Sequence, residues 1–301
     1  MKHLFILNPI AGGGLRTGQV RAEIIETMTA QSDEWELYET VGVQDATRKV
    51  REAAASGEEL RVYACGGDGT LNECVNGVVG NPHAAVTHFP AGTGNDFIKT
   101  FAIGTERFFK LENLLDPQEM TLDIMEVGGR YGINICSVGL DARIAADVHK
   151  YSGLPGVKGN TAYFLSLFAN IIKGIAKPFE VVIGGEIHNR KFSLICLCNG
   201  RSYGGAFTPV PEALPNDGML DILFVEKTSR MGVLNVVKTY AAGHYRKLPK
   251  LITPMQGTEM TVRADCEFAV NVDGEILYMK EAVFRLLPGA LRFFAPKGAG
   301  F

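Results

Sequence analysis

The sequence of 301 residues lacks any long apolar run. Its first such run, Leu4–Leu7, stops at Asn8 and Pro9. A helix that spans a bilayer needs about 20 predominantly apolar residues, and the core of a secretory signal peptide needs about 7 to 15. We therefore predict a cytoplasmic protein with no transmembrane segment.

The cysteine and histidine patterns of metal and redox sites are missing too. The sequence has no CxxC pair, no zinc-like quartet and no HExxH motif. A free thiol within an apolar run behaves as a small hydrophobic group, so reduced structural cysteines are favoured over ligands. The six are Cys65, Cys74, Cys136, Cys196, Cys198 and Cys266.

Charge is distributed unevenly along the chain. Residues 1–126 hold 10 Lys and Arg against 19 Asp and Glu, and residues 127–301 hold 20 against 14, so the two parts carry −9 and +6. The stretch Lys227–Lys250 has six basic residues and no acid. Such a stretch is typical of a solvated basic face, and it also suits an anionic phospholipid surface. We expect no nucleic-acid partner.

The first part of the chain alternates between strand-like and helix-like segments. Strands are predicted at "HLFILN", "WELYET", "LRVYAC" and "AAVTHFP", with helices near 18–30, at 45–55 and at "LNECVNGVV". This alternation favours βαβ units and a parallel sheet whose ligand crevice lies at the carboxyl ends of the strands. We predict an α/β domain at residues 1–124.

After residue 124 the sequence changes to short runs in which apolar and polar residues alternate, such as "FEVVIGG", "FSLICLCNG" and "MLDILFV". These predict antiparallel strands in a β-sandwich, interrupted by helical stretches near 161–176 and 231–242. We predict a β-rich domain at residues 125–286 and a tail at 287–301 that packs back on the first domain. The active site would lie in the cleft between the domains.

Three glycine-rich loops follow strands of the first part: "NPIAGGG" (8–14), "GGDGT" (66–70) and "AGTGND" (91–96). Backbone N–H groups and the positive end of a helix dipole favour a phosphate at such turns. Each loop alone is equally well explained as a tight turn, but three at one sheet edge indicate a nucleotide. The GxxxxGK[ST] motif and a complete GxGxxG fingerprint are absent, which excludes a P-loop enzyme and a plain dinucleotide-binding fold.

Together with "LNE" and "PAGTGNDF", these loops resemble the catalytic domain of diacylglycerol kinases and their bacterial lipid kinase relatives. "INICSVGLDA", "CNGRSYGGAFTPVPEALPNDGMLD" and "VNVDGE" are similar to the second-domain motifs of that family. The resemblance covers about Leu4 to Pro296 and implies a first domain like that of NAD kinases and phosphofructokinases. One departure is Ala206 in "YGGAF", where relatives often carry a third glycine.

The resemblance implies roles for individual residues. Asp68 would lie near the phosphates of Mg²⁺-ATP, and Glu275 in "VDGE" would be the general base. A structural Mg²⁺ would be held by the Asp217 carboxylate and the carbonyls of Leu214 and Met219. The ATP site would comprise Asn8, Pro9, Ile10, Ala11, Gly12, Thr40, Gly66, Gly67, Asp68, Gly69, Thr70, Leu71, Asn72 and Thr93.

Turn chemistry explains two of these motifs equally well. "NVDGEI" is a strong signal for a hairpin with a type I′ turn, and Asn-Asp-Gly in "PNDGMLD" is a turn sequence before it is a metal loop. One carboxylate would bind magnesium weakly without water or further ligands.

The resemblance implies an ATP-dependent lipid kinase, with diacylglycerol as the expected acceptor and phosphatidic acid as the product. Three alternatives stay open: a kinase for a sphingoid or other lipid alcohol, a soluble kinase of the NAD kinase type with Asp68 as base, and a non-catalytic nucleotide or lipid sensor. A homodimer also stays open, because exposed edge strands cannot be recognised from one sequence.

The segment "TAYFLSLFANIIKGIA" places Tyr163, Leu167, Asn170, Ile171 and Gly174 at helical spacing. This pattern is typical of a core helix, and it also suits the rim of a lipid entry cleft. A basic helix around 238–250 would then dock on anionic headgroups, which predicts a peripheral location at the inner face of the membrane.

Overall fold

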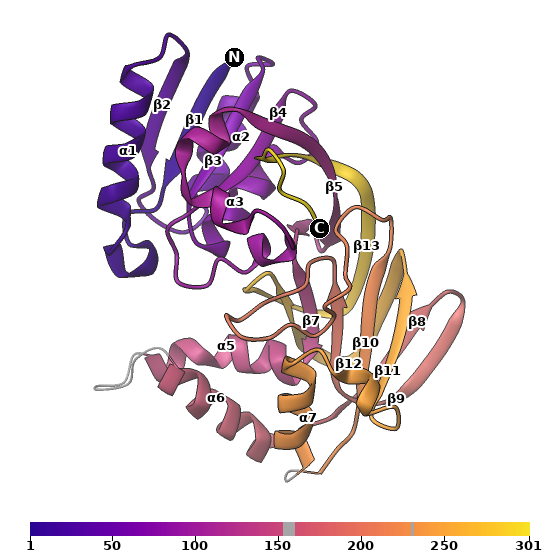
Figure 1. Cartoon of the computed structure of the whole chain (residues 1–301). Coiled ribbons are helices and arrows are strands. Elements are labelled where there is room, and N and C mark those ends of the chain that lie inside the picture. Colours follow the sequence, from indigo (N-terminus) through magenta and orange to yellow (C-terminus); the bar gives the residue numbers. More distant parts are fainter. Residues whose placement is uncertain (153–159, 230–231) are drawn as a thin grey trace.

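The computed structural model describes residues 1–152, 160–229 and 232–301. An α/β region at one end is followed by a β-rich region at the other, and two long strands run between them (Figure 1). The elements of the α/β region are β1 (Lys2–Leu7), α1 (Thr17–Thr29), β2 (Glu34–Glu39), α2 (Asp45–Ala54), β3 (Leu60–Gly66), α3 (Asp68–Val78), β4 (Ala84–Pro90) and α4 (Leu111–Leu115).

The remaining elements begin with the first of the long strands. They are β5 (Pro117–Val127), β6 (Arg130–Gly132), β7 (Ile135–Gly139), α5 (Leu140–Ser152), α6 (Asn160–Lys173), β8 (Lys177–Ile183), β9 (Glu186–Cys198), β10 (Leu220–Glu226), α7 (Gly232–Ala241), β11 (Ile252–Gly257), β12 (Glu259–Val272) and β13 (Glu275–Pro296).

Strands β2, β1, β3 and β4 are neighbours in that order, and each pair is parallel. Every residue of Leu4–Leu7 and of β4 is buried, as expected for parallel strands covered on both faces. The carboxyl ends of parallel strands lie at one edge, so the loops that follow β1, β3 and β4 start side by side.

Antiparallel pairing dominates the second region. Its strands are neighbours in the order β11, β10, β9, β7, β12 and β13, and β8 pairs with both β9 and β12. Strands β12 and β13 are joined by Asp273 and Gly274, whose φ angles of 49° and 100° are both positive. A type I′ turn requires this, so the predicted hairpin is confirmed. The predicted fold class, parallel α/β followed by an antiparallel region, is confirmed as well.

Strands β5 and β13 connect the two regions (Figure 1). The first part of β13 pairs with β12, its second part pairs with β5, and Phe293 near its end pairs with Val86 of β4. Asp123 in β5 is buried, and its carboxylate accepts hydrogen bonds from the N–H groups of Gly218 and Gly289 at 2.7 and 2.8 Å. Hydrogen bonds from two segments that are distant in the sequence therefore hold β5 in place between the regions.

Separate hydrophobic clusters fill the two regions. The first packs β1, β3 and β4 against α1 to α3 and the end of β13, around large side chains such as Phe5, Tyr63 and Phe293. The second lies among β7 to β10, β12 and β13. All six cysteines are free thiols, and all but Cys266 are buried.

The sequence analysis missed one helix and predicted another that does not form. Helix α5 was not predicted, although Leu140 and Ile144 form its buried stripe, because it begins directly after β7 with no polar linker. The predicted basic helix around 238–250 is wrong. Helix α7 ends at Ala241, Gly243 has a φ of +70° that breaks the helix, and Tyr245–Lys247 forms only a 3₁₀ turn.

Helix α6 lies where a helix was predicted near 161–176. The side chains of Tyr163 and Leu167 lie outside the described residues. Asn170 is buried, whereas Leu165 and Ile172 expose 38% and 55% of their surface, so the helix has a buried side and an apolar exposed side. Within the described ranges, no helix is both long enough and apolar enough to cross a membrane.

Candidate active site

The loops after β1, β3 and β4 meet so closely that glycine is required at their contacts. A Cβ atom on Gly92 would lie 2.3 Å from the Cα atom of Gly67. A Cβ atom on Gly12, whose φ is +57°, would lie 2.7 Å from the carbonyl oxygen of Ala91. Glycine alone permits such a backbone approach, so these loops form a surface made largely of main chain.

A cavity of about 270 Å³ opens between these loops and α2. Apart from its chain neighbours and the backbone of its own helix, no protein atom lies within 4 Å of the position that a Cβ atom on Gly69 would occupy, so the start of α3 is open toward the cavity. Eight of the residues predicted to hold ATP line this cavity: Asn8, Ala11, Gly12, Thr40, Gly67, Gly69, Thr70 and Thr93. A glycine-walled space at a helix N-terminus fits a nucleotide phosphate.

The other predicted ATP residues do not line this cavity. Ile10 is 80% exposed, and Pro9 contributes a carbonyl that accepts a hydrogen bond from Thr17 Oγ1 at 3.2 Å. Gly66 accepts hydrogen bonds on its carbonyl from the N–H groups of Ala91 and Gly92. Asp68, Leu71 and Asn72 point to the far side of α3.

Sequence reasoning missed two residues that support the loops around this cavity. Glu73 lines it and accepts hydrogen bonds from the N–H groups of Gln44 and Ala46 at 3.0 and 3.1 Å, which fixes the start of α2. His88 is buried beneath the loops, with its Nε2 3.0 Å from the Gly66 carbonyl oxygen. Burial lowers the pKa of His88, so a neutral ring donates this bond.

Asp68 joins two of the loops. Its Oδ1 accepts hydrogen bonds from the backbone N–H groups of Asp96 and Phe97 at 2.5 and 3.1 Å. A Cβ atom on Gly94 would lie 2.9 Å from its Oδ2. The first turn of α3 is thus tied to the loop after β4, and one carboxylate oxygen stays available for a further partner.

A second cavity of about 640 Å³ lies between the two regions, and Thr93 lines both cavities. Its walls combine carboxylates with apolar side chains. They include Asp68, Leu71, Gly94, Asp96, Phe97, Ile133, Asn134, Ile135, Asp141, Ala145, Tyr203, Gly204, Gly205, Ala206, Phe207, Asn271, Asp273 and Gly274. The Asp96 carboxylate crosses the gap and accepts a hydrogen bond from the N–H of Gly205 at 2.8 Å.

Asp273 also lines this second cavity. Its carboxylate accepts hydrogen bonds from the backbone N–H groups of Ile133 and Ile135, both at 2.7 Å, and of Asn134. It also accepts one from Nδ2 of Asn72 on α3 at 3.1 Å. Burial raises the pKa of Asp273 to about 6, although these hydrogen bonds favour the charged form. The residue connects the hairpin turn to both regions.

Glu275, the predicted base, begins β13 directly after the turn and is half-buried. Gly274 lines the second cavity, but Glu275 is not among its lining residues. The structure therefore brings Asp68 and Asp273 together around this cavity and places Glu275 one residue beyond it.

Two family models match the chain. The model of the diacylglycerol kinase catalytic domain matches residues 2–127, and that of the YegS C-terminal NAD kinase beta sandwich-like domain matches residues 134–295. The chain belongs to the diacylglycerol kinase catalytic-domain family.

Known relatives of this family are similar over most of the chain. A Staphylococcus haemolyticus protein named "Putative lipid kinase" is 28% identical over 232 residues, which cover 77% of this chain and 75% of the relative. A Bacillus anthracis structure titled as a "putative diacylglycerol kinase" matches with a TM-score of 0.75 at 23% identity, over 97% of this chain and 96% of that one. A second structure from that organism matches with a TM-score of 0.70 at 21% identity over the same shares. At these identities the two structures show the fold alone.

The departure at Ala206 puts no strain on the backbone of this loop. Gly204 and Gly205 have φ angles of 60° and 79°, whereas Ala206 has no positive φ. Because only the first two positions need glycine, alanine is tolerated at the third.

The loop predicted to hold a structural magnesium is exposed. Asp217 Oδ1 accepts a hydrogen bond from the N–H of Met219 at 3.0 Å, and the loop is tied to Asp123 through Pro215 and Gly218. One carboxylate with the flanking carbonyls, including that of Leu214, is an oxygen donor set of the kind magnesium takes. It fits the ion only if water supplies the remaining ligands.

Proposed function

We propose that this chain is an ATP-dependent lipid kinase that transfers the γ-phosphate to the hydroxyl of diacylglycerol and so makes phosphatidic acid. The observation that carries the proposal is the meeting of two unlike cavities at Thr93. One is walled by glycine backbone and suits phosphates, and the other combines carboxylates with apolar side chains and suits the hydroxyl end of a lipid. Phosphoryl transfer needs donor and acceptor oxygens roughly in line.

In this proposal, residues 1–124 and the tail 287–301 hold the nucleotide, and residues 125–286 hold the lipid. The pairing of Phe293 with Val86 supports this division, since it returns the end of the chain to the parallel strands. The hydrogen bonds of Asp96 and Asp273 across the gap would keep the two parts in register.

The nucleotide would be held mainly by backbone. The N–H groups around Gly12, Gly67 and Gly69 would surround the phosphates, and the available Oδ2 of Asp68, which faces the second cavity, would meet the γ-phosphate where it passes Thr93. Magnesium, when bound, neutralises charge that develops on the phosphate oxygens. Among the described residues, no three His, Cys, Asp or Glu side chains are grouped to hold a metal, so phosphate and water oxygens would supply most of its ligands.

We propose Glu275 as the residue that accepts the proton of the lipid hydroxyl. Asp273 is a poorer candidate, although its pKa of about 6 is suitable for a base, because backbone N–H groups already occupy both of its oxygens. Asp273 instead holds the turn from which Glu275 extends. A base that only orients the hydroxyl can suffice, because the transition state of phosphoryl transfer is loose.

We further propose that the enzyme meets its lipid at the inner face of the membrane. Ile172 and Leu165 of α6 are exposed apolar side chains, and Lys238, Lys247 and Lys250 are exposed in the basic stretch near α7. Apolar groups together with basic residues favour an anionic bilayer surface.

The test is phosphorylation of lipid in mixed micelles with labelled ATP and Mg²⁺, with products separated by thin-layer chromatography. We expect labelled phosphatidic acid from diacylglycerol. A panel of lipid alcohols that yields no labelled product would refute the proposal, and phosphorylation of NAD in a parallel reaction would indicate a soluble kinase of the NAD kinase type instead.

A further inference from the structure

A third cavity, of about 460 Å³, lies between α5, the end of α6, the start of β8 and strand β12. Its wall includes Arg143 and Ala146 of α5, Lys173 of α6, and Lys177 and Phe179 of β8. Small-molecule sites in proteins usually measure about 300 to 1,000 Å³. The third cavity is therefore large enough for a ligand of its own.

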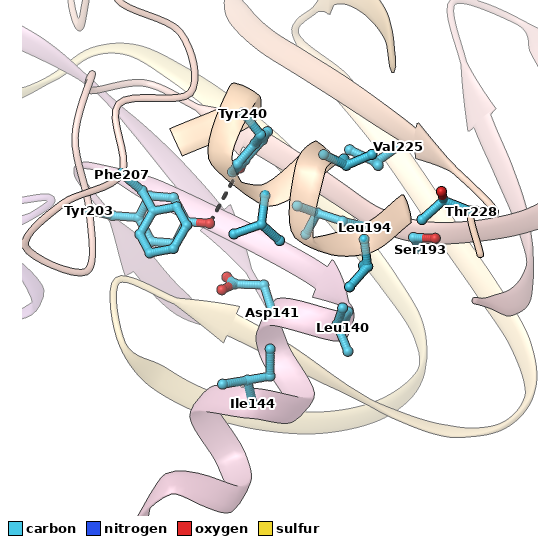
Figure 2. A pocket seen from close by; sticks show the side chains of 13 residues that line it. Leu140, Asp141, Ile144, Ser193, Leu194, Tyr203, Phe207, Val225, Thr228 and Tyr240 are labelled. Atoms are coloured by element: carbon cyan, nitrogen blue, oxygen red, sulfur yellow. Dashed lines mark hydrogen bonds between the residues drawn. The ribbon is translucent and has the colours of Figure 1, made fainter. Parts of the chain in front are cut away.

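Helix α5 separates this space from the proposed acceptor site. Asp141 lines the second cavity, whereas Arg143 and Ala146 line the third, and the described linings of the two cavities share no residue. Another face of the helix, at Leu140 and Ile144, borders a narrow apolar space of about 50 Å³ beside α7 (Figure 2). That space holds at most a few water molecules, so it offers no room for a ligand.

A bulge in β12 forms one wall of the third cavity. The strand leaves its ladder with β13 after Arg263 and rejoins it at Phe268, and the residues between them, 264–267, all line the cavity. Bulges are over-represented next to active sites. The rings of Phe179 and Phe268, whose centroids are 5.3 Å apart, also line the cavity and give it an aromatic surface that an apolar chain could contact.

Arg143 brings to this cavity a cation that no carboxylate neutralises directly. Its Nη2 donates to the carbonyl oxygens of Gly174 and Ile175 at 2.7 and 3.2 Å, and its Nε donates to that of Gly139 at 3.4 Å. Within the described part of the chain, Arg143 makes no ion pair and its Nη1 donates no hydrogen bond. The side chain is half-buried, and a charge removed from water without a partner costs free energy.

Two lysines lie beside Arg143. Lys173 and Lys177 stand on either side of the two carbonyls that Arg143 Nη2 holds, so the three cations share one side of the cavity. Lys173 pairs with Asp147 at 2.9 Å, whereas Lys177 is exposed and has no ion pair in the described ranges. Asp147 is the one carboxylate among the described lining residues of α5, α6 and β8, so positive charge is in excess on this side.

We propose that the third cavity binds a long-chain fatty acid, with its carboxylate on Arg143 Nη1 and Lys177 and its acyl chain against Phe179 and Phe268. Arginine and lysine form short, charge-assisted hydrogen bonds to carboxylates. Asp265 and Glu267 on the bulge also line the cavity, and both are exposed. Their charge disfavours a phosphate dianion and leaves a head with a single negative charge as the better match.

The experiment is calorimetry of the full chain with laurate below its micellar concentration, compared with dodecanol and butyrate. We expect saturable binding of one laurate. Dodecanol should bind at least about tenfold more weakly, because it lacks the charge-assisted hydrogen bonds. Butyrate should also bind at least about tenfold more weakly, because it buries far fewer methylene groups.

Two variants place the ligand in the third cavity. Lys177→Gln should weaken laurate about fivefold or more and leave dodecanol unchanged. Ala146→Leu fills part of the cavity and should weaken both ligands. Lys227→Gln is the matched control, because Lys227 is an exposed lysine outside the lining of the third cavity, and it should bind laurate as the wild type does.

The inference would be overturned by equal affinity for laurate and dodecanol, by no binding of laurate, or by wild-type laurate affinity in both variants. The last result would place laurate elsewhere, for example in the second cavity or on the exposed side of α6. If Ala146→Leu does not fold, Lys177→Gln decides, since its side chain is exposed. The measurement needs no ATP and no lipid acceptor, so its outcome is independent of the proposed kinase function.

Discussion

The cavity beside Gly12, Gly67 and Gly92 takes its shape from backbone, whereas the cavity beyond Thr93 takes its shape from side chains that come from distant parts of the chain. In the first, an added methyl group meets main-chain atoms at under 3 Å. In the second, Asn72 reaches Asp273 across 201 positions of sequence. The first is therefore sensitive to steric change and the second to loss of a hydrogen-bond partner.

Gly92→Ala should have the largest effect. Its Cβ atom would lie 2.3 Å from the Cα atom of Gly67, so the loops must separate and the cavity proposed to bind the nucleotide loses its wall. We expect loss of measurable ATP binding by calorimetry and a fall in stability of about 1–3 kcal/mol, the usual cost of overpacking.

Gly18→Ala is the matched control for that change, because open space surrounds its added methyl group and it lines neither cavity. It lies in α1, where alanine is favoured over glycine, so its thermal stability should match or exceed that of the wild type and its ATP affinity should be unchanged. Equal stability and ATP affinity of Gly92→Ala and the wild type would refute a cavity shaped by backbone contact.

Glu275→Gln should have the second-largest effect. We expect kcat to fall about 10²- to 10⁴-fold, because the proposed general base is lost. The glutamine is nearly isosteric, so ATP affinity and melting temperature should stay unchanged. Glu281→Gln on the same strand is exposed and serves as the control with wild-type turnover. A Glu275→Gln enzyme that binds ATP normally and retains full turnover would show that Glu275 is not the base.

Asp273→Asn should act mainly on stability. One of the backbone N–H groups that point at the carboxylate would lose its acceptor, at a cost of about 1–3 kcal/mol. Turnover should fall less than in Glu275→Gln, since the turn is loosened and the base remains. Urea unfolding at pH 7 measures this effect, and a variant as stable as the wild type would contradict the anchoring role.

The pH dependence of the wild type follows from the same residue. The folded pKa of Asp273, about 6, lies above the ordinary value of 3.8 for an aspartate side chain, so the folded state binds this proton more tightly than the unfolded state. Its contribution to stability is full below about pH 4 and is lost as the pH rises through 6, by up to about 3 kcal/mol. In Asp273→Asn the stability change between about pH 3 and 7 should be smaller by that amount, as unfolding curves across this range would show.

Asp217→Asn should have the smallest effect. If the loop binds magnesium, the ion at ten times its Kd stabilises the wild type by about 1.4 kcal/mol, and the variant should lose that gain. Differential scanning with and without Mg²⁺ measures it, with Asp265→Asn as an exposed control. An equal Mg²⁺ effect in wild type and Asp217→Asn would place the ion elsewhere.

The two cavities also differ in how far the sequence predicts them. Each glycine loop directly follows a strand, so "NPIAGGG", "GGDGT" and "AGTGND" indicated the edge of the sheet where the glycine-walled cavity lies without any long-range information. The Asp273–Gly274 turn was equally readable, because a two-residue turn with two positive φ angles demands such residues. Helix α5 was missed because no cap or linker separates it from β7.

The sequence did not predict which distant residues contact each other in the folded chain. His88 lies 22 positions from the carbonyl that it supports, and no local pattern marks it. Asp141 belongs to the stretch "INICSVGLDA", which is similar to a family motif. No neighbouring residue in the sequence indicated that Asp141 lines two cavities. A buried polar group finds its partner wherever packing places one, and packing involves the whole chain.

The sequence by itself determined the positions of the turns and of the glycine-rich loops, since the steric demands on glycine and the alternation of apolar residues act within a few residues. Only the tertiary structure decided that Asp68 turns its carboxylate toward the second cavity and that Asp273 ties α3 to the antiparallel strands. The physical reason lies in β5 and β13. These two strands pair with each other and run between the regions (Figure 1). With the regions held together in this way, Asn72 lies within hydrogen-bond distance of Asp273.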